Sequence, residues 1–330
     1  MENKNVLVTG CCGFIGAATC HGLKDGDGYN IFGLDNNISG GMNNSRRRQL
    51  FDNDIYSVHV ELLDQSDLMD LDDACSGWEF DAVIHLAAIP GVRESLIYPE
   101  RYYQNNFIGT LNILKLMRKY KIPKLVFAST SSVYDWNNAP YKPIGEQTSY
   151  IKSTHPYAGS KLAAEDLCRM YHELYGIDVS ILRLFTVYGP SGRPDMFPLR
   201  CIKWLIEGEP IKINGNGNQL RDFTYIDDVT DAIIKALEPI GCETFNIGKG
   251  TPWNLNAFIS MATKAVYGND ETKHPVEIQP SNKLDVSFTW ADNSKAREML
   301  NWEPKTGLEE GIQKTVDWYQ ENREVLKGII

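Results

Sequence analysis

The sequence predicts an α/β fold, in which a large doubly wound parallel sheet carries a smaller mixed α/β C-terminal domain. Short apolar runs alternate with helical patterns up to about residue 184, which is the rhythm of parallel strands joined by crossover helices. From about residue 186, Gly, Pro and Asn become more frequent, which predicts excursions from the sheet. The length of 330 residues suits one large or two modest domains.

Composition and charge argue against several classes of protein. Hydrophobic residues make up 42% of the chain, so a globular core is expected. The formal net charge of −10 argues against nucleic acid or an anionic membrane as a partner. The 7 cysteines show no Cys-x-x-Cys pair, and no leader or membrane-spanning stretch is apparent. We expect a cytoplasmic protein with reduced thiols and no metal. The dense basic run Arg46–Arg48 is more typical of a solvated helix face than of an anion site.

The first 35 residues match a dinucleotide-binding unit. A strand at 6–9 runs into a glycine loop from Gly10 to Gly16, a helix follows to about residue 24, and a strand at 31–34 ends at Asp35. Glycines let the backbone approach a diphosphate, and the helix N-terminus offers it N–H donors. Asp35 can accept hydrogen bonds from both adenosine ribose hydroxyls, while Asn36 and Asn37 offer no arginine for a 2′-phosphate. The pattern predicts a Rossmann-type domain that binds NAD rather than NADP.

The alternation continues beyond this unit. We expect strands at 55–60, 82–86, 124–128, 179–184 and 244–247, and helices at 99–120, 157–175, 196–207 and 229–237. The predicted NAD-binding domain is 1–184 with 222–249 and about 286–301; the second domain is 185–221, 250–285 and 302–330. The predicted cofactor contacts are Gly10, Gly13, Phe14, Ile15, Gly16, Asp35, Asn36, Glu61, Leu62, Leu86, Ala87, Ala88, Asn105, Ser129, Tyr157 and Lys161.

The strand at 124–128 leads into hydroxyl side chains, and Tyr157 and Lys161 lie four residues apart on one helix face. A free tyrosine has a pKa of about 10, and a neighbouring ammonium and a nicotinamide ring both favour its phenolate. The phenolate could take a proton from a substrate alcohol while hydride passes to NAD. Thr130 and Ser132 could orient the alcohol and relay its proton. These four side chains are the predicted catalytic residues.

Together, these features resemble the extended short-chain dehydrogenases/reductases of the nucleotide-sugar epimerase and dehydratase group. The matching residues are Gly10-x-x-Gly13-x-x-Gly16, Asp35, Leu86-Ala87-Ala88, Asn105, Ser129 to Tyr134, Tyr157-x-x-x-Lys161 and Arg221-Asp222-Phe223. The resemblance implies that Tyr157 is the base, Lys161 its partner and Thr130 the active-site hydroxyl, and that Arg221 binds the nucleotide phosphates. It also implies a homodimer formed by the helices at 99–120 and 157–175, whose several apolar faces, such as Leu111, Ile113, Leu114, Leu116 and Met117, fit that role.

The triplet Thr130-Ser131-Ser132 separates the reactions of this group. Dehydratases resemble Thr-Asp-Glu at this place, and UDP-glucuronate decarboxylases resemble Thr-Ser-Glu. Without a carboxylate, elimination lacks its acid and base, and reversible hydride transfer by a 4-epimerase remains.

Thr186 and the segment from Gly192 to Met196 resemble the UDP-glucuronate 4-epimerase subgroup, whereas UDP-galactose epimerases usually have Asn at the first position. The planar fork of Arg193 suits a sugar carboxylate. The expected reaction is NAD-dependent conversion of UDP-glucuronate to UDP-galacturonate through a 4-keto intermediate. The predicted substrate contacts are Arg93, Ser131, Thr186, Arg193, Ile213, Arg221 and Asp285.

Three alternatives remain open. The nearest is a UDP-glucose or UDP-N-acetylglucosamine 4-epimerase, and the next is a UDP-glucuronate decarboxylase. The third is a non-catalytic scaffold or redox-sensing member, although such proteins should have lost Tyr157 or Lys161. Three features depart from the family. Asn282 stands where many members have arginine, and Lys283 is the candidate replacement. Asp135 stands where the family usually has glycine, and Cys11-Cys12 is an unusual pair for the glycine loop.

Overall fold

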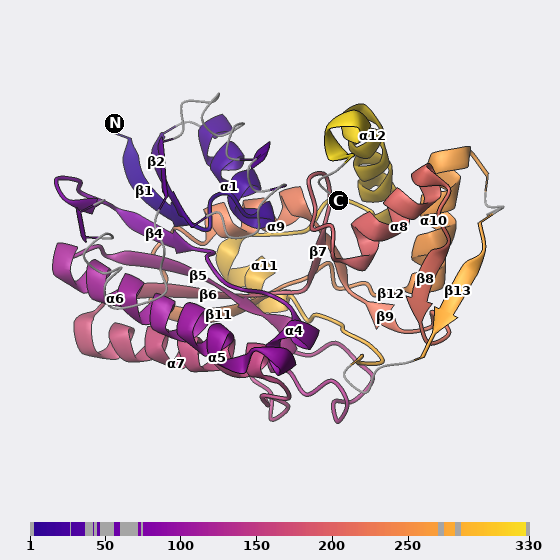
Figure 1. The fold of residues 1–330 in the computed structure, drawn as a ribbon. Coiled ribbons are helices and arrows are strands. Elements are labelled where there is room, and N and C mark those ends of the chain that lie inside the picture. Colours follow the sequence, from indigo (N-terminus) through magenta and orange to yellow (C-terminus); the bar gives the residue numbers. More distant parts are fainter. Residues whose placement is uncertain are drawn as a thin grey trace.

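The computed structural model describes residues 3–26, 28–36, 42, 45–46, 56–59, 72–73, 75–269, 274–280 and 285–327. Within this part of the chain, a seven-stranded sheet lies between two layers of helices (Figure 1). The strand order is β3-β2-β1-β4-β5-β6-β11, and every neighbouring pair is parallel. The chain therefore winds outwards in both directions from the centre, which confirms the predicted doubly wound α/β fold.

The strands of this sheet are short apolar segments covered on both faces, as parallel strands require. All four residues of β4 are buried, for example, and so are the first four of β5. Their bounds are β1 (Lys4–Thr9), β2 (Tyr29–Asp35), β3 (Tyr56–His59), β4 (Ala82–His85), β5 (Lys124–Thr130), β6 (Asp178–Leu184) and β11 (Cys242–Ile247).

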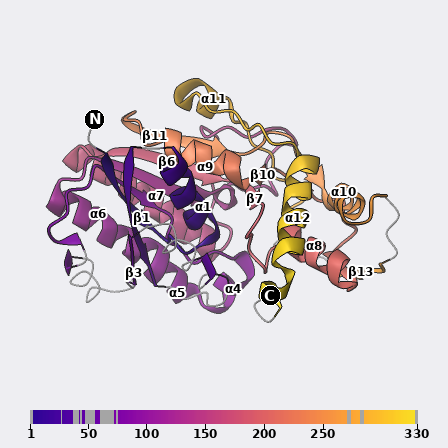
Figure 2. The ribbon, with the colours of Figure 1, turned by 90° about the horizontal axis from the view of Figure 1, so that it is seen from above.

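Helices from distant parts of the chain share each face of the sheet (Figures 1 and 2). One face carries α1 (Phe14–Asp25), α9 (Ile226–Lys235) and α11 (Ser294–Leu300). The other carries α5 (Pro99–Tyr102), η1 (Tyr103–Ile108), α6 (Gly109–Tyr120) and α7 (Pro156–Tyr175), with the short α4 (Val92–Ile97) nearby.

The helix predicted at 99–120 contains one π-helical turn, η1, which the sequence did not reveal. The wider turn places Asn105 and Asn106 in the interior, where they are 8% and 0% exposed. Single π-turns inside helices are frequent at functional sites. The π-helical turn therefore contains Asn105, one of the cofactor contacts that the sequence predicts.

A second group of elements lies beyond the carboxyl edge of the large sheet (Figure 1). Among its described residues are three two-stranded sheets, formed by β7 with β10, β9 with β12, and β8 with β13. The bounds are η2 (Ser131–Val133), β7 (Thr186–Tyr188), α8 (Phe197–Glu207), β8 (Ile211–Asn214), β9 (Leu220–Arg221), β10 (Phe223–Tyr225), β12 (Trp253–Asn254), α10 (Leu255–Tyr267), β13 (Val276–Gln279) and α12 (Leu308–Leu326). The domain boundaries given by the sequence stay a prediction.

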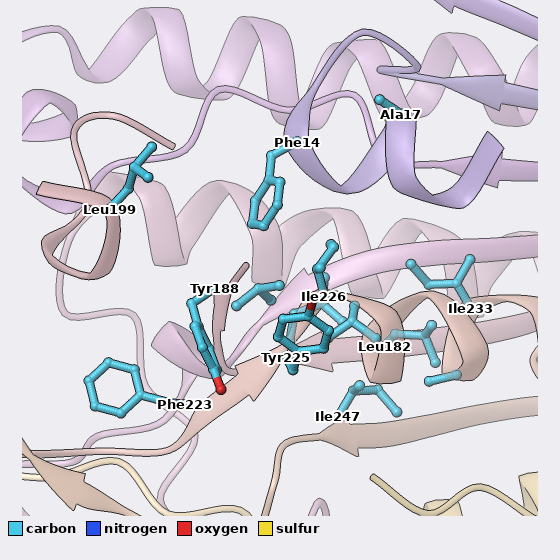
Figure 3. Close-up of a cluster of buried hydrophobic side chains, with 14 of the residues drawn as sticks. Phe14, Ala17, Leu182, Tyr188, Leu199, Phe223, Tyr225, Ile226, Ile233 and Ile247 are labelled. Carbon is cyan, nitrogen blue, oxygen red and sulfur yellow. The ribbon is translucent and has the colours of Figure 1, made fainter. Parts of the chain in front are cut away.

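A hydrophobic cluster joins the two groups of elements (Figure 3). Phe14 of α1 and Leu182 of β6 belong to the same cluster as Tyr188 of β7 and Leu199 of α8. Burying one such side chain contributes about 1.5–3 kcal/mol. The cluster thus fixes the elements that surround the carboxyl edge of the sheet.

The apolar residues on which the homodimer prediction rested lie mainly in the core of the chain itself. Ile113, Leu114, Leu116 and Met117 of α6 are all buried. The homodimer stays a prediction, and Leu174 of α7, 66% exposed, is a better candidate for such a contact. All 7 cysteines are free thiols, and none of the helices in the described ranges is long and apolar enough to cross a membrane.

Candidate active site

A cavity of about 810 Å³ lies at the carboxyl edge of the sheet, where open α/β sheets bind ligands. Its walls come from the glycine loop, the ends of β2, β4 and β5, the first turns of α7, and the loop after β7. The residues predicted from the sequence that line it are Gly10, Gly13, Phe14, Ile15, Gly16, Asp35, Asn36, Leu86, Ala87, Ala88, Asn105, Ser129, Thr130, Ser131, Ser132, Tyr157, Lys161, Thr186 and Arg193. The fold therefore brings most of the predicted site together.

Four predicted substrate contacts are not among the described residues that line the cavity: Arg93, Ile213, Arg221 and Asp285. Two of them pair with each other, because Arg93 Nη2 donates to both carboxylate oxygens of Asp285 at 3.1 and 3.0 Å. Burial lowers the pKa of Arg221 to about 10, and its Nη1 donates to the carbonyl of Leu220. Glu61, Leu62 and Lys283 lie outside the described residues. The functional roles of all these residues stay predictions.

The glycine loop has the shape that a dinucleotide needs. Gly10 has a φ of +72°, and a Cβ there would lie 2.7 Å from the backbone nitrogen of Ala87. A Cβ on Gly16 would lie 2.0 Å from the carbonyl oxygen of Gly10. Helix α1 begins after Gly13 with no side-chain cap, so its first N–H groups can bind an anion. With Asp35 at the end of β2, these residues fit the diphosphate and adenosine ribose of NAD.

His85 is a buried residue at the end of β4 that the sequence did not reveal, because it stands inside an apolar run. Its Nδ1 lies 2.6 Å from Thr9 Oγ1 and its Nε2 lies 3.0 Å from Thr110 Oγ1. Thr110 donates to the carbonyl of Asn106, and Thr9 accepts from the N–H of Ala87. The imidazole is therefore neutral and carries its proton on Nε2, which donates to Thr110, while Nδ1 accepts from Thr9. Burial and the charge of Lys161 lower the pKa of His85 to about 3.

Asn106 extends this network from η1 to α7. Its Oδ1 accepts from the N–H of Ile89 at 2.7 Å and from Asn105 Nδ2 at 3.0 Å. Its Nδ2 donates to the carbonyl of Ile89 and to Ser160 Oγ, which in turn donates to the carbonyl of Tyr157. The segment after β4 and the first turn of α7 are thus held by one buried set of hydrogen bonds.

Tyr157 is half-buried in the first turn of α7. Burial raises its pKa, while a hydrogen bond with Thr130 and the charge of Arg193 act in the opposite direction. The sequence had attributed this opposing charge to Lys161. In the structure, Lys161 Nζ lies 4.1 Å from the centroid of the Phe127 ring instead, and burial lowers the pKa of Lys161 to about 8.

A buried ion pair fixes α7 to the sheet. Arg183 of β6 donates to both oxygens of Glu165, at 2.9 and 2.7 Å, and Ser129 Oγ donates to one of them at 2.6 Å. Burial raises the pKa of Glu165, but the hydrogen bonds and charge of Arg183 bring it below its ordinary value. Ser129 also lines the cavity, so this support lies directly beside the site.

The loop between β7 and α8 carries Arg193 to the cavity. Arg193 Nε and Nη2 donate to the two carboxylate oxygens of Asp195, at 3.0 and 2.5 Å. Arg46, only 4% exposed, donates from Nε to Ser191 Oγ at 3.1 Å and from Nη2 to the carbonyl of Gly192. The expectation that the basic run forms a solvated face is therefore wrong for Arg46. Asp195 also went unpredicted, although it stands in the same segment that singled out Arg193.

The fold and the cavity define an NAD-dependent enzyme. Residues 6–248 match the model of the NAD dependent epimerase/dehydratase family, and the chain belongs to that family. NAD is accordingly its cofactor, and the residues of the glycine loop and the end of β2 are those expected to hold it.

Similar proteins point to a narrower group. The chain is 41% identical to a UDP-glucuronate 4-epimerase of Thermodesulfobacterium geofontis, over 98% of each chain. The UDP-glucuronic acid 4-epimerase of Bacillus cereus, solved with UDP-glucuronic acid and NAD, superposes with a TM-score of 0.86, at 33% identity over 96% of this chain and 99% of that one. The UDP-glucose 4-epimerase of Thermotoga maritima, solved with UDP-glucose, gives a TM-score of 0.87, at 31% identity over 97% and 99%.

Proposed function

We propose that the protein is a UDP-glucuronate 4-epimerase, which interconverts UDP-glucuronate and UDP-galacturonate. The family and the relatives support the broader statement, an NAD-dependent 4-epimerase of UDP-sugars. The choice of sugar rests on one observation: Arg193 lines the same cavity as Thr186 and Ser131.

The first turn of α7 supplies the proton chemistry. Tyr157, hydrogen-bonded to Thr130, can accept the proton of the C4 hydroxyl once its phenol is ionised. Bound NAD supplies the acceptor and donor of the C4 hydride. The buried ammonium of Lys161 lines the same cavity and can hold a ribose hydroxyl of the cofactor.

The end of β5 supplies hydroxyls and no carboxylate. Thr130 accepts the N–H of Ser132 at 3.1 Å, which shapes the turn that presents Ser131 and Ser132 to the cavity. Hydroxyls can orient the C4 oxygen and exchange its proton, but they cannot replace the acid and base of an elimination. This chemistry favours epimerisation over dehydration.

The guanidinium of Arg193 can bind a second carboxylate besides Asp195. Asp195 uses Nε and one Nη2 hydrogen, and a guanidinium presents another bidentate edge at Nη1 and the second Nη2 hydrogen. A 4-keto uronate is a β-keto acid that can lose carbon dioxide. Holding its carboxylate on Arg193, Thr186 and Ser131 would oppose that loss.

A UDP-glucose 4-epimerase is the alternative. The observation in its favour is the Arg193–Asp195 ion pair, because the Asp195 carboxylate offsets the charge that would otherwise attract a uronate. A sugar with a neutral C6 group would not need that charge.

The decisive experiment is to incubate the purified protein with UDP-glucuronate, without added NAD, and to resolve the products by NMR. We expect a mixture of UDP-glucuronate and UDP-galacturonate, which would also show that the cofactor is retained. Release of a UDP-pentose would instead indicate a decarboxylase. No turnover of the uronate, with turnover of UDP-glucose, would contradict the choice of sugar.

The variant Arg193→Ala tests the observation that carries the proposal. We expect kcat/KM for UDP-glucuronate to fall by about 10- to 100-fold, because a charge-assisted bidentate contact is lost. We also expect any epimer that forms to be accompanied by UDP-pentose. Arg200→Ala is the matched control, because Arg200 stacks on Trp204 at 4.6 Å and does not line the cavity. Equal kinetics for the two variants would refute the carboxylate role.

A further inference from the structure

The residue before the α7 helix is an unusual one for its position. His155 is the N-cap of α7, with φ −159° and ψ 162°, and its ring nitrogen Nδ1 accepts the N–H of Ala158 at 3.2 Å. Asn, Asp, Ser and Thr are the side chains that normally make this hydrogen bond. None of those four changes its ability to accept a hydrogen bond between pH 5 and 8, whereas histidine does.

The same ring contacts the predicted catalytic base. The imidazole of His155 and the phenol of Tyr157 are stacked, with their planes 8° apart and their centroids 6.1 Å apart. Tyr102, fully buried, meets Tyr157 edge-on at 6.1 Å and donates its own hydroxyl to the carbonyl of Pro90. His155 is not among the described residues that line the cavity, so it can act on the reaction only through Tyr157 and the first turn of α7.

We propose that His155 is a positioning residue for Tyr157, and that its cap holds the first turn of α7 in place only while the imidazole is neutral. This inference rests on the proposed role of Tyr157. With Nδ1 as acceptor, the neutral ring carries its proton on Nε2. A second proton on Nδ1 turns the acceptor into a donor that faces the N–H of Ala158. The resulting cation would also stand at the positive end of the α7 dipole.

Few charged groups act on this imidazole. Burial lowers the pKa of His155. Among the described residues, the charged side chains of α4 and α5, which pack on α7, are Arg93, Glu94, Glu100 and Arg101, and none of them contributes to this shift. The titratable group packed directly on the ring is the phenol of Tyr157. The phenol of Tyr103 in η1 reaches Gly159, one turn further along α7.

Acid should weaken the His155 cap. The folded pKa of His155 is lowered from its ordinary value of about 6.5, so the cap contributes fully above that pH. The contribution is lost as pH falls towards the folded pKa. Both the stability of the first turn and the alignment of Tyr157 should therefore weaken on the acid side.

The test compares His155→Asn, which keeps a cap acceptor but cannot be protonated, with His155→Ala, which has no acceptor. Turnover of the UDP-sugar substrate is measured from pH 5 to 8.5. Between pH 8.5 and pH 5, we expect kcat of the native enzyme to fall about fivefold more than kcat of His155→Asn. We expect kcat of His155→Ala to be about fivefold lower at every pH, because that is the usual effect of a missing cap. His172→Asn, at the other end of α7, should keep the native pH profile.

Thermal unfolding at the same pH values needs no substrate and separates this inference from the proposed function. Between pH 7.5 and pH 5, we expect the Tm of the native chain to fall roughly 1–3 °C further than that of His155→Asn. Superimposable pH profiles for the native chain and His155→Asn, in both kcat and Tm, would overturn the proposal. A chain that turns over no UDP-sugar yet shows the Tm difference would overturn the function and leave the cap intact.

Discussion

The glycine loop and the loop between β7 and α8 both line the cavity, but they are held in different ways. At the glycine loop, backbone packs on backbone, so that a Cβ on Gly16 would come within 2.0 Å of a carbonyl oxygen. The second loop is held by side chains: Arg46 donates to the backbone carbonyls of Ser191 and Gly192, and Arg193 pairs with Asp195. The cofactor side therefore tolerates almost no change, whereas a few side chains can retune the sugar side.

The largest effect should come from breaking the backbone packing. We expect Gly16→Ala to abolish NAD binding, because neither the Gly10 carbonyl nor Cys11 can move away from the new methyl group without unfolding the loop. Isothermal titration of the NAD-free protein with NAD measures this loss. Gly26→Ala is the control, since its Cβ would lie 3.4 Å from the nearest atom and φ is −82°. Normal NAD affinity in Gly16→Ala would show that the loop is not rigid.

A smaller effect should follow from releasing the second loop. Arg46→Ala would leave the carbonyls of Ser191 and Gly192 without their buried donor. We expect kcat/KM to fall about tenfold for uronate and neutral UDP-sugars alike, equivalent to about 1.4 kcal/mol, because the whole loop is loosened. Arg118→Ala, on the outer surface of α6, is the matched control. A loss confined to the uronate would mean that Arg46 reads the sugar directly.

The smallest effect should come from the exposed ion pair. We expect Asp195→Asn to lower KM for UDP-glucuronate about two- to threefold and to leave KM for UDP-glucose unchanged. The reason is that a neutral amide no longer offsets the charge of Arg193, and ion pairs of this exposure contribute about 0–1 kcal/mol. Steady-state kinetics with the two sugars checks it. A higher KM for the uronate would show instead that Asp195 mainly orients the guanidinium.

The sequence predicted those parts of the site whose residues lie close together along the chain. The strand, glycine loop, helix and acid of the first unit, and the four-residue spacing of Tyr157 and Lys161, are visible in the sequence because each depends on neighbours in the chain. The π-turn η1 was missed because nothing local distinguishes it from an ordinary helix, and it is stabilised by contacts of Asn106 with Ile89 and Ser160.

Side chains that act through distant partners could not be found from the sequence. His85 reads as part of an apolar strand until Thr9 and Thr110 are placed on its two ring nitrogens. Arg46 reads as one of three surface arginines until Gly192, 146 positions away, is brought to it. Contacts between residues so far apart in the sequence cannot be recognised from the neighbouring residues, since only the fold decides which segments meet.

The sequence by itself determined the fold class and the cofactor, and it predicted the residues and chemistry of the site, because periodicity, turn residues and helix-face spacing are local properties of the chain. The tertiary structure decided which groups control those residues. It placed the opposing charge for Tyr157 on Arg193 rather than on Lys161, and paired Arg193 with Asp195. It also put the α7 cap in contact with the Tyr157 ring. Electrostatics and hydrogen bonding depend on distance and burial, and both are set only when the chain has folded.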